Sequence, residues 1–161
     1  MTPSLVPIVE ILELDTRLFE KALADLDREA LVRRIVANSN PIIWIAGHLT
    51  WARFSMAGLL DAKLTFPFPP VFGRGAVLGD EASLPHADEV LSAWRDVSDI
   101  LADRLSEATE AQLMAPSPRP LPIGDKTILG MIAFLTYHEG YHIGQLALLR
   151  KALGLSGLVD A

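Results

Sequence analysis

Two histidines four residues apart form the motif with the clearest chemistry in this chain. They are His138 and His142, within the sequence His-Glu-Gly-Tyr-His. On an α-helix, side chains at this spacing project from one face about one turn apart, so the two imidazoles can bind one metal ion. Glu139 completes the HExxH pattern of zinc peptidases, in which a carboxylate serves as the general base.

The third ligand that such a peptidase needs is missing downstream of the motif. After His142 the chain contains no His, Glu or Cys, and Asp160 is the only carboxylate side chain there. A zinc peptidase is therefore disfavoured, because its third ligand normally follows the motif. If a metal binds here, its third ligand lies upstream.

Two histidines, His48 and His86, are the upstream candidates. His48 lies in an apolar run, where burial of a lone imidazole is costly unless it gains a partner such as a metal shared with His138 and His142. His86 follows a proline at the expected start of a helix, where a solvated side chain explains it, and we leave it out of the site. Three His ligands match an open, zinc-type site. The alternatives are chance spacing and a core histidine bonded to a backbone carbonyl.

Glu139 and Gln145 are the candidates for supporting the chemistry at the ion. Glu139 follows His138 directly and therefore points about 100° away around the helix. A general base and a packed carboxylate bonded to a neighbouring helix are equally good interpretations of it. Gln145, three residues beyond His142, is the best candidate to orient a ligand histidine through its second ring nitrogen, ahead of Tyr137 and Tyr141.

Packing roles are expected for other residues near these histidines. Gly140 and Gly144 each cost up to about 1 kcal/mol within a helix relative to alanine. The close approach of another helix, inside the bundle or across a homodimer interface, would offset that cost. Trp44, one turn before His48, is predicted to form a wall of the pocket.

Composition limits the classes of protein that remain. A chain of 161 residues, half of them apolar, suits one domain spanning residues 1–161. The absence of cysteine excludes disulfides and thiolate ligands and is consistent with a cytoplasmic protein, and we see no signal peptide. The net charge of −6 disfavours nucleic-acid binding. No apolar run approaches the roughly 20 residues that a membrane span requires.

Apolar periodicity and capping residues predict an all-α four-helix bundle with a long crossover between helices two and three. The first two expected helices run from Pro3 to about Leu26 and from Pro41 to about Asp61, the second capped by Asn40 of the loop 38–40. The third runs from Pro85 to about Ala108. The fourth begins after a cap at Asp125 or Thr127 and ends at Gly154.

The expected crossover covers about residues 62–82 and is rich in proline and glycine. Such a composition makes a helix unlikely in this segment. We expect it to lay Phe66, Phe68 and Phe72 over the bundle, with the further possibility that it forms a lid over the metal.

Two motifs together resemble those of the DinB-like (DinB/YfiT) superfamily of metalloenzymes. One is Trp44-Ile45-Ala46-Gly47-His48-Leu49, and the other is the stretch from Tyr137 to Leu146, which contains HxxxHxGQ. The second motif is the distinctive one, and the resemblance extends over essentially the whole chain.

This resemblance implies a four-helix bundle, often dimeric, that holds a divalent metal such as nickel or zinc on His48, His138 and His142. It also implies a range of activities, among them the transfer of low-molecular-weight thiols to small electrophiles. A metal-dependent hydrolase with Glu139 as base and a non-catalytic metal or ligand binder are the alternatives. Family analogy alone cannot decide a substrate.

Overall fold

The computed structural model describes residues 1–161 except 37–38, 74, 77–82 and 160–161. Four long helices dominate it: α1 (Val6–Leu23), α3 (Ile42–Leu59), α4 (Ala87–Glu107) and α6 (Ile128–Ala152). Short helices α2 (Arg28–Val32) and α5 (Glu110–Leu113) and the 3-10 turns η1 (Pro3–Leu5) and η2 (Pro70–Phe72) lie between or before them. Within the described residues there is no strand, only an isolated bridge between Pro116 and Thr127. The predicted all-α four-helix bundle is confirmed.

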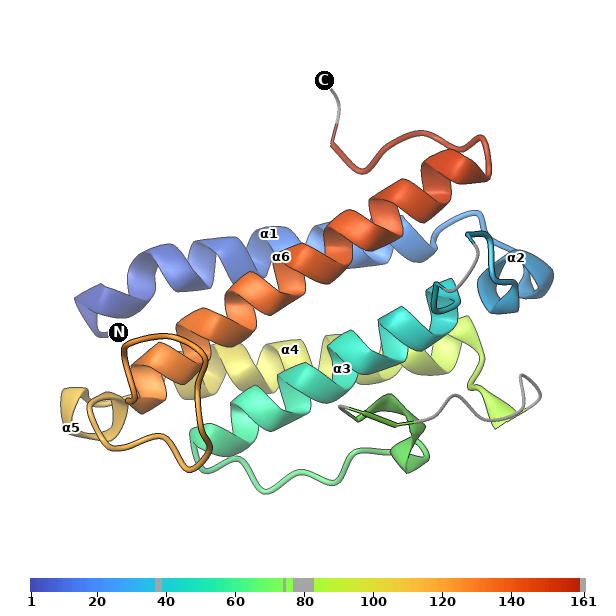
Figure 1. The fold of residues 1–161 in the computed structure, drawn as a ribbon. Coiled ribbons are helices and arrows are strands. Elements are labelled where there is room, and N and C mark those ends of the chain that lie inside the picture. Colours follow the sequence, from blue (N-terminus) through green and yellow to red (C-terminus); the bar gives the residue numbers. More distant parts are fainter. Residues whose placement is uncertain (37–38, 74, 77–82, 160–161) are drawn as a thin grey trace.

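Each long helix packs against two others, which closes the bundle. Helix α3 contacts α4 and α6, while α1 contacts α6 and α4 (Figure 1). The chain passes from α3 to α4 through the predicted long crossover, and residues 77–82 of this crossover lie outside the described part. Asn38 of the expected loop before α3 also lies outside it. No helix in the described part is long and apolar enough to cross a membrane.

The helix ends follow local capping chemistry, with one correction. Thr127 caps α6 by accepting a hydrogen bond from the Gly130 N–H at 3.1 Å, and Gly154 ends it with a φ of 80°. Pro41, not Asn40, is the N-cap of α3, because its ψ of 155° is extended and helical geometry begins at Ile42. The prediction was one residue early.

Helix α3 is buried on most of its circumference, which explains why its composition is apolar all round. The crossover covers its outer side, and Phe72 at the end of η2 is fully buried there, with Phe66 and Phe68 packed against the same cluster. The predicted covering role of these phenylalanines is confirmed. A Cβ added to Gly47 would lie 2.3 Å from Phe72 Cε1, so a glycine at this position allows the phenyl ring to approach α3.

The two glycines of α6 do not have the packing role expected inside the bundle. Gly140 and Gly144 are both exposed, and a Cβ added to either would meet nothing within 4 Å. Close approach of another helix of the same chain is therefore the wrong explanation. The interface between two copies of the chain stays a prediction.

Candidate metal centre

The structure brings His48 of α3 together with His138 and His142 of α6. The Nε2 atoms of His48 and His138 are 3.1 Å apart, as are those of His138 and His142. One ligand atom from each ring lies within 4.8 Å of the others. His86 has a different role, because it is the N-cap of α4 and its N–H donates to Glu89 at 2.7 Å.

Hydrogen bonds at the Nδ1 atoms decide which nitrogen of two rings is free to bind an ion. His48 Nδ1 lies 2.6 Å from the carbonyl oxygen of Phe72, and His142 Nδ1 lies 2.6 Å from Gln145 Oε1. The Gln145 amide nitrogen in turn donates to the Tyr141 hydroxyl at 3.4 Å, which turns its oxygen toward His142. Both acceptors need a proton on Nδ1, so both Nε2 atoms carry lone pairs directed at the centre of the triad.

This donor set fits a divalent cation. Two Nε2 lone pairs face the Nε2 atom of His138, and a single proton on that atom can satisfy only one of them at a time. The Nδ1 atom of His138 is buried without a partner, so no hydrogen bond fixes the tautomer of this ring and its Nε2 atom can also carry a lone pair. A cation bound by the three Nε2 atoms would satisfy all three lone pairs, and three neutral imidazoles are suitable ligands for zinc or nickel.

All three imidazoles favour the neutral form that a metal requires. Burial, together with the smaller effects of the neighbouring His142 and His48, lowers the pKa of His138 to about 4. Burial also lowers the pKa values of His48 and His142, against the opposing effects of their hydrogen bonds to Phe72 and Gln145. The triad is therefore available as a ligand set at neutral pH.

Two tryptophans hold the ring of His48 between them. Trp44 stacks on it with ring centroids 5.1 Å apart, and Trp51 does so at 5.7 Å. The indole N–H of Trp44 donates to the Val71 carbonyl at 2.8 Å, which ties the ring to the crossover. Trp44 is absent from the cavity walls, whereas Trp51 lines the cavity next to the triad. The prediction that Trp44 walls the pocket is wrong, because Trp44 faces the crossover.

A cavity of about 790 Å³ adjoins the triad, and His48 and His138 form part of its wall. Apolar residues of α3 and α6 line most of it, and its remaining wall is the proline-rich segment 119–122. Figure 1 shows the loop before α6 beside the C-terminal end of α3. Among the residues that the structure describes, this loop borders the cavity and the crossover does not. The described crossover residues instead support His48 through the Phe72 carbonyl.

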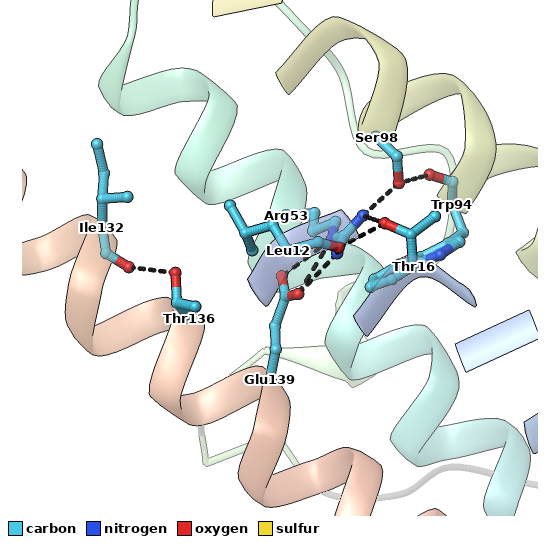
Figure 2. Close-up of polar contacts among 8 residues, drawn as sticks. All are labelled: Leu12, Thr16, Arg53, Trp94, Ser98, Ile132, Thr136 and Glu139. Atoms are coloured by element: carbon cyan, nitrogen blue, oxygen red, sulfur yellow. Dashed lines mark hydrogen bonds and ion pairs between the residues drawn. The ribbon is translucent and has the colours of Figure 1, made fainter. Parts of the chain in front are cut away.

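Glu139 lies in the core, paired with Arg53 of α3 (Figure 2). Neither side chain is more than 1% exposed, and the Arg53 Nη2 atom lies 2.9 Å from Glu139 Oε2. Complete burial raises the pKa of Glu139, and the Arg53 guanidinium offsets part of that rise. Of the two interpretations of Glu139, the structure shows the carboxylate bonded to a neighbouring helix. It is absent from the cavity wall.

Arg53 uses its whole guanidinium group in this network. Besides Glu139 it donates to Thr16 Oγ1 at 2.7 Å, to Ser98 Oγ and to the Leu12 carbonyl, and it lies 3.7 Å from the centroid of the Trp94 ring (Figure 2). The network therefore joins α1, α3, α4 and α6 directly behind the His138 turn. A buried arginine is costly unless its N–H groups have hydrogen-bond acceptors, and these contacts offset the cost of removing the guanidinium from water.

Sequence reasoning missed Arg53, Asp15 and the wall formed by residues 119–122. Arg53 did leave a signal, since it is a charged residue in an otherwise apolar helix and such a residue demands a buried partner. Asp15 is buried with Oδ2 unpartnered, and burial and the nearby Glu139 raise its pKa to about 6, with Arg53 opposing them. Nothing in the local sequence around residues 119–122 indicated which helices this segment would face.

Fold and site together define a class of protein, namely a helical bundle in which three histidines of the second and last long helices are placed so that they could hold a metal ion. The DinB superfamily matches residues 11–146, and the chain belongs to this family. No curated protein matches it significantly.

Among solved structures, the chain is similar to YfiT from Bacillus subtilis, which is described as a probable metal-dependent hydrolase with an unusual four-helix bundle topology. The TM-score is 0.69 at 15% sequence identity, and the match covers 93% of this chain and 87% of YfiT. At this level of identity the likeness establishes the fold.

Proposed function

We propose that this protein is a metal-dependent enzyme that acts on small electrophiles, with a divalent ion, nickel or zinc, held by His48, His138 and His142. The observation that carries the proposal is the convergence of three Nε2 atoms at the wall of a cavity large enough for a small molecule. Three protein ligands leave room at such an ion for a reacting group.

The reaction we favour is the transfer of a low-molecular-weight thiol. An ion at this site would lower the pKa of a coordinated thiol or water and so supply a nucleophile near neutral pH. The chain has no cysteine, so the sulfur must come from a cosubstrate. Among the described residues that line the cavity none is Asp or Glu, and Glu139 is engaged by Arg53. These facts favour a reaction that does not need a carboxylate base from the protein.

Hydrolysis is the second candidate, and the likeness to YfiT favours it. In that case the ion would activate water. Glu139 could serve as base only after leaving Arg53, and this would strand a buried guanidinium at a cost of about 3–5 kcal/mol. A hydrolase using this site would therefore depend on the ion to ionise its bound water, without a carboxylate base from the cavity wall.

The deciding experiment supplies metal-loaded protein with an aryl or epoxide electrophile, with and without a panel of low-molecular-weight thiols. We expect turnover that requires both metal and thiol and that is lost in His142→Ala. Glu139→Gln should retain turnover when its rate is divided by the folded fraction of the variant, and circular dichroism measures that fraction. Metal-dependent turnover without thiol would refute thiol transfer and support hydrolysis. No turnover by an intact metal centre would support a non-catalytic binder.

The partners we propose are the small-molecule substrate, the thiol and a second copy of the chain. A homodimer is discussed below with its test. The reducing cytoplasm is the compartment we propose, because low-molecular-weight thiols are kept reduced there. The net charge of −6 speaks against nucleic acid as a partner.

A further inference from the structure

The cavity beside the triad has a simple charge pattern that the metal site does not explain. Its wall is mostly apolar and aromatic, formed by residues such as Trp51, Leu59 and Phe134. Arg119 supplies the only charged side chain among the described lining residues, and none of them is acidic. Arg119 is exposed, and in a chain with a net charge of −6 its guanidinium gives this carboxylate-free cavity a locally positive charge that favours anions.

Arg119 lies where this cavity meets a second one of about 620 Å³. Both cavities share Trp51, Ser55, Leu59 and Arg119 as lining residues, so the arginine is at their common boundary. The second cavity contains one carboxylate, Asp61, which accepts a hydrogen bond from Gln112 Nε2 at 2.9 Å. Within the described part of the chain, the Arg119 guanidinium itself has no hydrogen bond or ion pair.

The backbone that carries Arg119 is held in place independently of any ligand. Ser117 Oγ donates to the Arg119 carbonyl at 2.8 Å and accepts from the Arg119 N–H at 3.3 Å. Prolines precede and follow Arg119, which restricts both neighbouring φ angles. Lys126 Nζ donates to the Leu121 carbonyl at 2.7 Å, and the Ser117 N–H donates to the Lys126 carbonyl at 2.7 Å. A ligand would therefore need to order the arginine side chain but not its loop.

We propose that Arg119 binds the carboxylate of an organic-acid substrate whose apolar body occupies the 790 Å³ cavity next to His48 and His138. A planar guanidinium pairs with a carboxylate through two parallel hydrogen bonds. The Ser55 hydroxyl, which lines both cavities, is within the same wall as a second donor. The identity of this substrate class rests on the proposed function, since the triad marks the reacting end of the cavity.

The test compares an acid with its neutral amide on metal-loaded protein. The probes are 4-phenylbutyrate and 4-phenylbutanamide, which share an apolar body, and their dissociation constants are measured by isothermal titration calorimetry. We expect the wild type to prefer the acid by roughly tenfold, the scale of one charge-assisted hydrogen bond. Arg119→Gln should lose this preference while keeping its affinity for the amide. Arg17→Gln, which removes an exposed arginine of α1, should behave as the wild type.

Three outcomes would overturn the proposal. They are a preference for the acid that persists in Arg119→Gln, equal affinity of the wild type for acid and amide, and binding of neither compound. A preference for the acid that persists in Arg119→Gln would mean that the carboxylate binds the metal. In that case the visible spectrum of cobalt-loaded protein would change when the acid is added. Metal content measured on the same samples separates this test from that of the proposed function. If the triad binds no metal and Arg119 still discriminates, the proposed function fails and the anion site stands.

Discussion

At the histidine triad, the Nδ1 atoms of two imidazoles are as informative as the three Nε2 atoms. Phe72 and Gln145 accept from His48 and His142, which leaves both Nε2 atoms as acceptors directed at one point. A triad without these acceptors could relieve the clash of lone pairs by changing tautomer. With them, the simplest way to satisfy the three rings is a shared cation.

We therefore expect about one divalent ion per chain. His48→Ala, His138→Ala and His142→Ala should each weaken binding by more than roughly 100-fold, because loss of a supporting partner alone costs about 10–100-fold. His86→Ala, which alters only the cap of α4, is the control and should bind normally. Elemental analysis and competition with a chelator measure both quantities. Normal metal binding by any of the three triad variants would contradict this assignment.

The same centre should lose its ion on acidification. Protons compete with the metal for neutral imidazoles, so affinity falls with falling pH. Because burial lowers the pKa of each ring, and that of His138 to about 4, the neutral form persists below the ordinary imidazole value of 6.5. We expect metal retention at pH 6 and release toward pH 4, followed by equilibrium dialysis. Release complete by pH 6.5 would contradict the lowered values.

The buried carboxylate of Asp15 should destabilise the folded protein at neutral pH. Its pKa is raised from 3.8 to about 6, so the folded state disfavours the ionised form. This cost is present above pH 6 and disappears below pH 3.8, where both states bind the proton. Asp15→Asn should therefore raise the free energy of unfolding by about 1–3 kcal/mol at pH 7.5, with the gain vanishing near pH 4.

Urea unfolding at the two pH values measures that difference. Asp99→Asn in α4, where the carboxylate is exposed, is the matched control and should change stability little at either pH. An Asp15→Asn variant less stable than the wild type at pH 7.5 would show that the carboxylate makes a favourable interaction in its ionised form.

At the level of elements, helix α3 and the crossover together position His48 of the triad. The crossover supplies the carbonyl that fixes the His48 tautomer and the acceptor for the Trp44 indole. Both contacts depend on Phe72 packing directly on the backbone of Gly47. The glycine one residue before His48 is thus part of the support for the ligand.

Gly47→Ala should weaken metal binding without removing a ligand. The new Cβ would lie 2.3 Å from Phe72 Cε1, so the ring and its carbonyl must move away from His48. We expect a loss of about 10–100-fold in metal affinity, as for other partners of metal ligands. Gly58→Ala in the same helix, where an added Cβ meets nothing within 4 Å, is the control. Equal metal affinities of the two variants would refute the coupling.

At the scale of the whole molecule, the outer face of α6 is apolar and is not covered by any of the described residues. Tyr137, Tyr141 and Leu148 are 70%, 56% and 62% exposed on it, and Gly140 and Gly144 lie between them. Exposed aromatic and aliphatic side chains around small residues are typical of a surface that packs against another helix. We predict that this face forms a homodimer interface about a two-fold axis.

Light scattering tests this prediction at tens of micromolar chain, a concentration at which specific dimers should be intact. We expect a dimer for the wild type and a monomer for Leu148→Asp, which places a charge in the proposed interface. Leu64→Asp is the control, since Leu64 is an exposed apolar residue of the crossover. A monomeric wild type would count against the dimer.

The sequence by itself determined the four helices and the pair His138 and His142, because both depend on local spacing. Apolar periodicity and the Thr127 cap are properties of neighbouring residues. His138 and His142 lie on the same face of their helix whatever the tertiary structure around it. His48 could be selected because the other upstream histidine had a local explanation. These inferences required no knowledge of which helix faces which.

Only the tertiary structure decided what surrounds the triad. Glu139 pairs with Arg53, 86 residues away in the chain, and not with the site beside it. Likewise Trp51 rather than Trp44 lines the cavity, and a proline-rich loop completes its wall. The reason is physical: helix periodicity tells which residues turn inward, whereas the partner of each inward residue depends on how whole helices and their connections pack.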